Sequence, residues 1–383
     1  MSGKNGTGEP GERSGAGEAA ARMGAGERAA GGERSGATEK TTPGERASET
    51  TAVTSHAAGH GQPAAGAHGQ AGAFAIMVPC STSNLGPGFD AIGLALSGPD
   101  LIVRATPGGD RLRIGRLSGE GADRLPRDAT NRVIQAAHRC AVAAGLDPAR
   151  LCAELDIHSS IPLKRGLGSS AAAAVAGALL ADRLLGGVIG EERVLHTAVE
   201  LEGHPDNVVP SLRGGAQVSV RCEDGRIVSC PIVIKGSLRA AIYIPDQELA
   251  TSAARSVLPA QVSLGDAVFN LGRAALLTAA LSQGRFELLA EAMEDRLHQP
   301  ARAGLLPWLP ELLREARAAG ALGAALSGAG TTICALCTGE NVREVARRLM
   351  DAAAARGVSG RAEVVEVGVG GARIVPSASF APQ

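Results

Sequence analysis

The chain has 383 residues, a net charge of −1 at pH 7, seven cysteines and only 2% aromatic residues. A net charge so close to zero gives no strong field for nucleic acid or an anionic membrane surface, and so few aromatic side chains argue against a base-stacking surface. We find no run of 18 apolar residues and no export signal, so we expect no membrane span, reduced thiols and a cytoplasmic protein.

The first 72 residues differ in composition from the rest of the chain. They contain no Leu, Ile, Phe, Tyr or Trp. Such a segment cannot bury enough apolar surface to offset its ordering entropy, so residues 1–72 are predicted to be a disordered low-complexity tail. About 310 residues follow, which is enough for roughly two domains. We expect these domains at residues 73–236 and 237–383.

Hydrophobic spacing after the tail predicts strands mixed with helices. The predicted strands are 74–79, 101–105, 112–114, 151–159, a hairpin at 217–222 and 226–234, 238–244, 330–337 and 362–369. The predicted helices are 131–144, 169–185, 191–202, 264–282, 286–297, 309–319 and 341–356. The order shows no regular βαβα alternation, so it predicts an α+β fold. Cys334 and Cys337 would lie on opposite faces of a buried strand, which favours a structural role over a metal or redox pair.

Residues 162–172 form a glycine- and serine-rich segment that runs directly into an alanine-rich helix. Glycine lets a backbone approach a ligand closely, and a helix start offers unpaired N–H groups and the positive end of the helix dipole. With Lys164 and Arg165 beside it, the segment predicts a phosphate-binding loop. A purely structural helix cap is the alternative. The dinucleotide fingerprint G-x-G-x-x-A also matches, but its strand context is missing.

Three further motifs carry polar groups. Residues 78–90 contain a predicted Gly/Asn/Pro loop at 81–89. Asp90 at its end could accept hydrogen bonds from a substrate ammonium or hydroxyl; an ordinary turn is the alternative. Residues 200–207 span the end of the predicted helix 191–202. They carry carboxylates suited to Mg²⁺ and a histidine suited to acid–base chemistry or to a structural hydrogen bond. Residues 326–332 form a second glycine loop, which a plain turn would also explain.

In this order the four motifs resemble the GHMP kinases (galactokinase, homoserine kinase, mevalonate kinase and phosphomevalonate kinase), and most closely the homoserine kinases. The matching segments are Asn84-Leu-Gly-Pro-Gly-Phe-Asp90, Gly166-Leu-Gly-Ser-Ser-Ala171, Glu202-Gly-His-Pro-Asp-Asn207 and Ser327-Gly-Ala-Gly330, with weaker matches at 254–259 and 295–302. The resemblance covers about residues 74–375. It implies a ribosomal protein S5 domain 2-like N-terminal domain, a ferredoxin-like C-terminal domain and a site between them.

The resemblance also implies an activity: transfer of the γ-phosphoryl group of ATP to the side-chain hydroxyl of L-homoserine, in threonine biosynthesis. A GHMP kinase for another small alcohol and a catalytically silent ligand sensor of the same fold are the alternatives. A homodimer is compatible with either.

Site residues are implied by the same resemblance. ATP would contact Pro162, Leu163, Lys164, Arg165, Gly166, Leu167, Gly168, Ser169, Ser170, Ala171 and Ala172. Homoserine would contact Asn84, Asp90, His204, Asp206, Arg255 and Arg302. Mg²⁺ would bind Glu200 and Ser170, with Glu202 as the alternative to Glu200. Asp206 would orient the reacting hydroxyl, and Lys164 would stabilise transition-state charge. We further expect Gly168→Val to lose ATP affinity without unfolding, because a branched side chain would collide with the phosphates.

Overall fold

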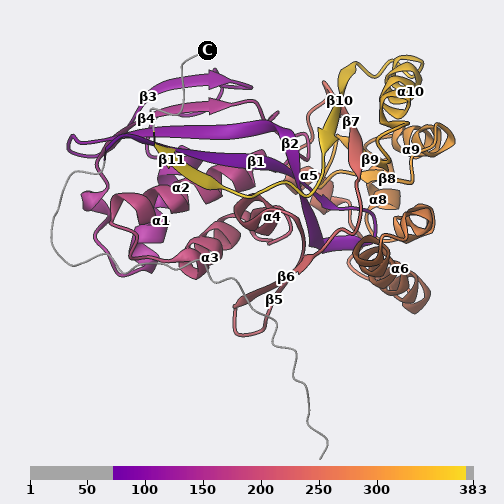
Figure 1. Cartoon of the computed structure of the whole chain (residues 1–383), viewed down its shortest axis with the longest axis horizontal. Coiled ribbons are helices and arrows are strands. Elements are labelled where there is room, and N and C mark those ends of the chain that lie inside the picture. The colour runs from indigo at the N-terminus through magenta and orange to yellow at the C-terminus, as the bar shows by residue number, and fades with distance from the viewer. Residues whose placement is uncertain (1–71, 377–383) are drawn as a thin grey trace, which may run out of the picture. The chain divides into compact units, whose positions relative to one another are not determined.

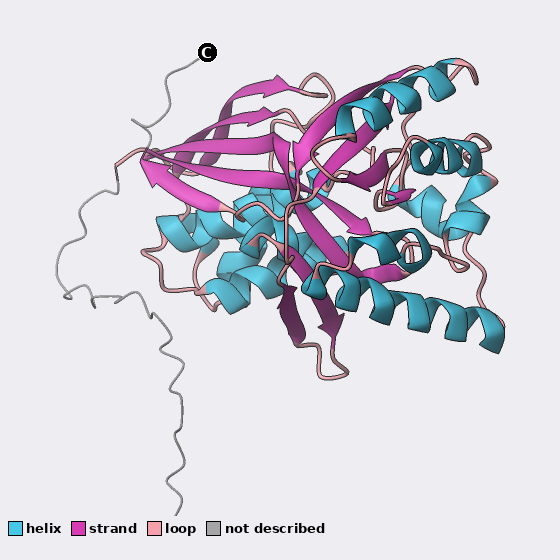
Figure 2. Ribbon diagram, turned by 45° about the vertical axis from the view of Figure 1, so that its right-hand side comes forward, coloured by secondary structure: helices cyan, strands magenta, loops and turns pink. Residues whose placement is uncertain are grey.

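The computed structural model describes residues 72–376, and all of the predicted tail except Gly72 lies outside these residues. Two β-sheets with helices packed against them make up the described part (Figure 1). The α+β prediction is therefore confirmed. Figure 2 shows the same helices and strands from a second direction, with helices flanking both sheets.

The first sheet has seven strands, in the order β11-β1-β2-β4-β3, with β5 pairing β2 and β6. These strands are β1 (Phe74–Asn84), β2 (Gly88–Pro107), β3 (Leu112–Gly119), β4 (Ala153–Ser159), β5 (Ala216–Arg221), β6 (Ile227–Ile232) and β11 (Arg373–Pro376). Four helices lie along one side of it: α1 (Arg132–Ala143), α2 (Ser169–Leu184), α3 (Glu191–Glu202) and α4 (Val208–Arg213) (Figure 1). The alanines of α2 are almost all buried, so α2 is the central helix of this layer.

The second sheet is antiparallel throughout, in the order β10-β7-β9-β8. Its strands are β7 (Arg239–Pro245), β8 (Gly323–Leu326), β9 (Ile333–Cys337) and β10 (Gly360–Glu366). Its helices are α5 (Thr251–Ser256), α6 (Leu264–Gln283), α7 (Leu289–Ala292), α8 (Gln299–Ala303), α9 (Leu309–Ala318) and α10 (Val342–Ala354). The strands follow one another in the β-α-β-β-α-β manner of a ferredoxin-like domain.

The expected boundary at 236/237 falls between β6 and β7. One element crosses it: β11, close to the end of the described chain, pairs with β1 in the first sheet. The sequence analysis missed β8 and β11, because each is only four residues long and has no clear hydrophobic periodicity. The predicted helix 286–297 is wrong, because the structure has only a 3₁₀ turn at Phe286–Leu288 and the four-residue α7 there.

The predicted loop at 81–89 is largely strand. β1 continues to Asn84 and β2 begins at Gly88, because residues 81–83 pair with 93–95 of β2. Glycine, asparagine and proline predicted a loop here, but pairing in the buried sheet overrides that local preference. The reversal is confined to a few residues, and Asn84, Leu85 and Asp90 have positive φ angles there.

Helix α6 has an exposed apolar side formed by Leu264, Val268 and Leu271. Within residues 72–376 it is also the one helix long and apolar enough to cross a membrane by length and composition. One such helix is weak evidence for a span, so the expected absence of a membrane partner stays a prediction.

Candidate active site

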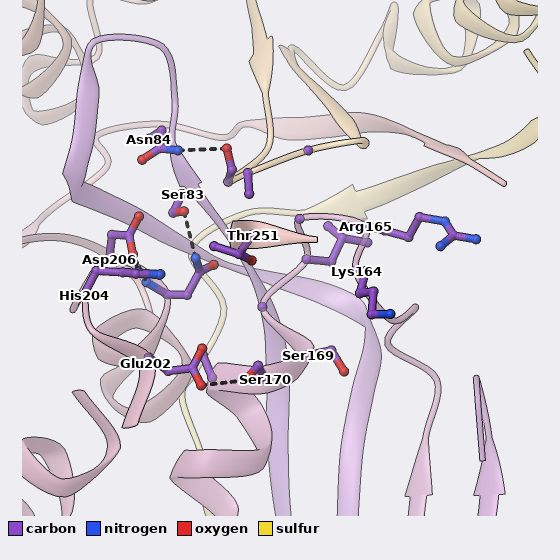
Figure 3. A pocket seen from close by; sticks show the side chains of 18 of the residues that line it. Ser83, Asn84, Lys164, Arg165, Ser169, Ser170, Glu202, His204, Asp206 and Thr251 are labelled. Carbon is purple, nitrogen blue, oxygen red and sulfur yellow. Dashed lines mark hydrogen bonds and ion pairs between the residues drawn. The ribbon is translucent and has the colours of Figure 1, made fainter. Parts of the chain in front are cut away.

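All four sequence motifs line one pocket (Figure 3). The predicted residues found there are Asn84, Asp90, Pro162, Lys164, Arg165, Gly166, Leu167, Gly168, Ser169, Ser170, Ala171, His204, Asp206, Arg255 and Arg302. Leu163, Ala172 and Glu200 are not part of its lining. The sequence analysis missed Arg132, Ser83, Asn207, Leu249, Thr251 and 328–330, which line it as well. Of these, Ser83, Asn207 and 328–330 lie within the motifs already singled out, whereas Arg132, Leu249 and Thr251 lie outside them.

The glycine loop ends at the N-terminus of α2, which points into the pocket. Gly168 is the N-cap residue, with φ +71°, and no side chain caps the first turn. The N–H groups of that turn are therefore available to an anion, and the helix dipole favours negative charge there. This geometry agrees with the predicted phosphate-binding loop.

The two glycines of this loop are needed for contacts inside the protein. A Cβ at Gly168 would come closer than 3.0 Å to Ser81 Oγ, and one at Gly166 would do the same with the carbonyl oxygen of Ser327. The first collision of a Gly168 side chain would thus be with the buried strand β1. The expectation that Gly168→Val would spare the fold is therefore wrong.

The two basic residues of the loop, Lys164 and Arg165, differ in how firmly their side chains are bound to the rest of the protein. Arg165 donates to the carbonyls of Pro245 at 2.6 Å and Asp246 at 2.5 Å, so it ties the loop to the end of β7. Lys164 is 58% exposed, and its ammonium lies 3.5 Å from Glu248. Lys164 is therefore the freer of the two cations at the pocket rim.

The carboxylate beside Ser170 is that of Glu202. Ser170 Oγ donates to Glu202 Oε1 at 2.6 Å, and the Glu202 side chain is 9% exposed (Figure 3). Residues two apart on a helix point in different directions, and Glu200 is half exposed, 3.6 Å from His196 on the preceding turn. The position of Glu200 therefore does not suit the metal-binding role first assigned to it, and the alternative, Glu202, has the right position.

A second cluster of titratable side chains lines another part of the pocket. Single ligand atoms of Asp90, His204 and Asp206 lie within 4.8 Å of one another. Both carboxylate oxygens of Asp90 accept from the guanidinium of Arg255, at 2.7 and 3.0 Å. His204 Nδ1 hydrogen-bonds to Asp206. Opposite charges therefore already face each other across this part of the pocket.

The His204–Asp206 pair keeps Asp206 ionised. Burial alone would raise the pKa of Asp206, but hydrogen bonds from His204 and Ser83 and the attraction of His204 hold it below its ordinary value. Burial would lower the pKa of His204, yet its hydrogen bond and attraction to Asp206 raise it. Asp206 is thus ionised and a weak base.

Arg302 is buried beneath this cluster, with 1% of its surface exposed. Its Nη1 donates to the Gly328 carbonyl at 2.9 Å and to His298 Nδ1 at 3.0 Å. Burial, with the nearby charge of Arg255, lowers the pKa of Arg302 to about 10. Since His298 donates through Nε2 to Gly86 and accepts at Nδ1, it is held neutral, and burial likewise lowers its pKa.

Asn84 joins the first motif to the last. Its Nδ2 donates to the same Gly328 carbonyl, at 2.8 Å, and its Oδ1 accepts from the backbone N–H of Asp90 at 3.0 Å. Asn84 therefore helps to fix the backbone that carries Asp90, besides lining the pocket.

Known proteins resemble this chain in both sequence and fold. Residues 131–215 match the family described as GHMP kinases N terminal domain, and 277–355 match GHMP kinases C terminal. The chain is 39% identical to the homoserine kinase of Desulfitobacterium hafniense over 78% of its own length and 99% of that protein's. It is 42% identical to the homoserine kinase of Moorella thermoacetica over 69% of its own length and 87% of that protein's.

Two solved structures give the fold. A homoserine kinase from Cytophaga hutchinsonii superposes with a TM-score of 0.72 at 29% identity, covering 82% of this chain and all of that one. The mevalonate kinase of L. major, solved with R-mevalonate, gives 0.57 at 18% identity over 79% and 95%, and so shows likeness of fold alone. The predicted two-domain GHMP kinase architecture is confirmed.

Proposed function

Because the chain belongs to the homoserine kinases of the GHMP kinase family, we propose that it transfers the γ-phosphoryl group of ATP to the side-chain hydroxyl of L-homoserine, in threonine biosynthesis. The observation that carries this proposal is that four motifs far apart in the sequence line one pocket, in a chain that spans almost the whole length of a curated homoserine kinase. The family relationship supports a soluble enzyme, and we place it in the cytoplasm.

The phosphates of ATP fit the open N-terminus of α2, where first-turn N–H groups face the pocket. Ser170 and Glu202 fit Mg²⁺, a hard cation that takes oxygen ligands and usually one or two carboxylates. When bound, Mg²⁺ would neutralise charge on the phosphoryl oxygens. Lys164, exposed at the rim with its ammonium 3.5 Å from Glu248, would add a further positive charge. Positioning and electrostatics supply most of the acceleration in this kind of transfer.

L-Homoserine carries an ammonium and a carboxylate next to each other, and the pocket offers one partner for each. Asp90 suits the ammonium, and the planar fork of Arg255 suits the carboxylate. Arg302, below them, adds positive charge without leaving its buried hydrogen bonds. Asn84 and His204 complete the substrate-binding set.

The hydroxyl of the substrate would be oriented by Asp206. In the transfer, the hydroxyl oxygen forms a bond to the γ-phosphorus, the bond to the leaving ADP oxygen breaks, and the hydroxyl proton is released. The lowered pKa of Asp206 makes it a better acceptor of a hydrogen bond than of the proton. We therefore assign Asp206 an orienting role, with the proton passing to the phosphoryl group.

One coupled assay tests the proposal. ADP release from MgATP is measured with L-homoserine and, in parallel, with mevalonate, galactose and L-serine. The proposal requires turnover with L-homoserine well above the others. Turnover with another alcohol instead would make the chain a different small-molecule kinase. Tight binding of a ligand without ADP release from any of them would favour a silent sensor.

A further inference from the structure

Arg132 lies at the metal-binding end of the pocket, although no sequence motif contains it. Its Nη2 donates to Glu202 Oε1 at 2.9 Å. Its Nε and Nη2 also lie 3.2 and 3.1 Å from Ser170 Oγ. One guanidinium therefore contacts both side chains that are proposed to bind Mg²⁺.

The position of Arg132 is fixed by the start of α1 and by close helix packing. The N-cap Asn131 accepts from the N–H of Val133 at 3.0 Å and donates to the Pro126 carbonyl at 2.8 Å, so the backbone before and after Arg132 is held. Gly177 of α2 lets α1 approach, because a Cβ there would collide with the Val133 carbonyl. These contacts bring the first residue of α1 to the first turn of α2.

A positively charged side chain is electrostatically unfavourable at the N-terminus of α2. The N-terminus of α2 is the positive end of a helix dipole, which disfavours a further positive charge. The ion pair with the nearly buried carboxylate of Glu202 stabilises Arg132 there. The side chain of Arg132 itself is 36% exposed. The guanidinium therefore has room to move, whereas the carboxylate does not.

Arg132 and a bound metal ion would compete for the same atom, Glu202 Oε1. A Mg²⁺–oxygen bond is about 2.0–2.1 Å long, so a divalent ion on Glu202 Oε1 would repel a guanidinium that lies 2.9 Å from this atom. The forked donors of arginine match phosphate oxygens as well as carboxylates. Phosphates at the α2 N-terminus would lie within the same part of the pocket.

The geometry points to Arg132 as an exchangeable cation of the nucleotide site: it holds Glu202 and Ser170 in position, yields Glu202 to the incoming Mg²⁺ and turns to the phosphates of ATP. This inference rests on the proposed function, since it takes Glu202 and Ser170 as the metal ligands. Arg132 would thus compete with the metal ion for Glu202 before the nucleotide binds and become a contact residue for the nucleotide afterwards.

The inference predicts opposite effects on two affinities. Without the competing cation, Arg132→Met should bind Mn²⁺ more tightly in the absence of nucleotide. The same variant should bind ATP more weakly in EDTA. Each change should be about tenfold or less, the scale of one charge-assisted hydrogen bond at a partly exposed site. A purely structural arginine would weaken both affinities when removed.

The experiment uses the full chain. Mn²⁺ binding is followed through the electron paramagnetic resonance signal of the free ion, and ATP binding by calorimetry in EDTA. Arg132→Lys keeps the charge but loses the fork, so it should fall between the wild type and Arg132→Met in both assays and serves as the readout if the methionine variant folds poorly. Arg139→Met is the matched control, because Arg139 is exposed on the same helix and outside the pocket.

Glu202→Gln separates this inference from the proposed function. If Glu202→Gln binds Mn²⁺ like the wild type, the metal ligands are misassigned and the proposed site fails. If Glu202→Gln loses Mn²⁺ while Arg132→Met weakens Mn²⁺ binding or leaves ATP binding unchanged, the site stands and the role of Arg132 is overturned.

Discussion

Replacing Gly168 by alanine should destabilise the fold, and the structure sets the size of the effect. Gly168 has a φ of +71°, and a left-handed conformation costs an alanine about 1–2 kcal/mol. Its new Cβ would also collide with Ser81 Oγ. That hydroxyl donates to Asn207 Oδ1 at 3.0 Å and accepts from Ser211 Oγ at 3.0 Å, all of them buried. Displacing it would break one or both bonds, at about 0.5–1.5 kcal/mol each.

The two contributions together predict a loss of about 1.5–5 kcal/mol in the free energy of unfolding. Urea denaturation of the full chain measures this loss. Gly145→Ala is the matched control, since Gly145 also has a φ of +71° but nothing within 4 Å of the added Cβ. The control should show only the backbone contribution of about 1–2 kcal/mol.

The double variant Gly168→Ala/Ser81→Ala tests the cause of the excess loss. Removing the Ser81 hydroxyl removes the atom that the new Cβ would meet, so the two substitutions should cost less together than the sum of their separate costs. Equal losses for Gly168→Ala and Gly145→Ala, with additive behaviour in the double variant, would refute the argument that Gly168 is required by packing against β1.

Three further predictions concern the substrate end of the pocket. The raised pKa of His204 contributes stability that is full below about pH 6.5 and is lost as pH rises through the folded-state value, and the lowered pKa of Asp206 contributes stability that is lost in acid. The stability gap between wild type and His204→Gln, from urea unfolding, should therefore be widest between about pH 4 and 6.5; a gap constant with pH contradicts this. Arg255→Lys should raise the KM for L-homoserine about tenfold and leave that for ATP unchanged, because lysine cannot offer the substrate carboxylate the two-pronged contact that Arg255 makes with Asp90 in the structure; equal changes in both KM values would count against it. Asp206→Asn should lower kcat and keep the basic limb of the pH–rate profile, whereas loss of that limb would identify Asp206 as a general base.

The sequence predicted the long elements because each has its own local signals. The helix over 131–144 has regular apolar spacing, and in the structure Asn131 caps its start. The predicted helices at 169–185 and 191–202 likewise agree with α2 and α3 to within a residue. The elements that sequence analysis missed, such as β8 and β11, are short and are held by neighbours rather than by their own pattern.

The sequence could not decide which of several candidate residues takes each role in the site; that depends on contacts in three dimensions. A helix places residues 200 and 202 on different sides, so the sequence implied that only one carboxylate could face the nucleotide. The sequence did not say which of the two it is, because Glu200 and Glu202 both fit the hydrophobic pattern that predicted α3 as polar positions near its end. Arg132 gave no signal at all, since a basic residue at a helix start reads as a solvated side chain. Its place in the pocket depends on Gly177 and the approach of α1 to α2.

The charges of this pocket are paired across its elements, which changes how ligand binding should be understood. The pairs are Asp90 with Arg255, Glu202 with Arg132, and Asp206 with His204. A zwitterionic substrate and a metal–nucleotide complex would therefore exchange partners with existing ion pairs, and only the difference between the old and new pairings counts toward affinity. Two of these pairs, Asp90 with Arg255 and Glu202 with Arg132, join segments far apart in the sequence. The order of the motifs could therefore predict the chemistry of these groups but not the partner from which a ligand must displace each of them.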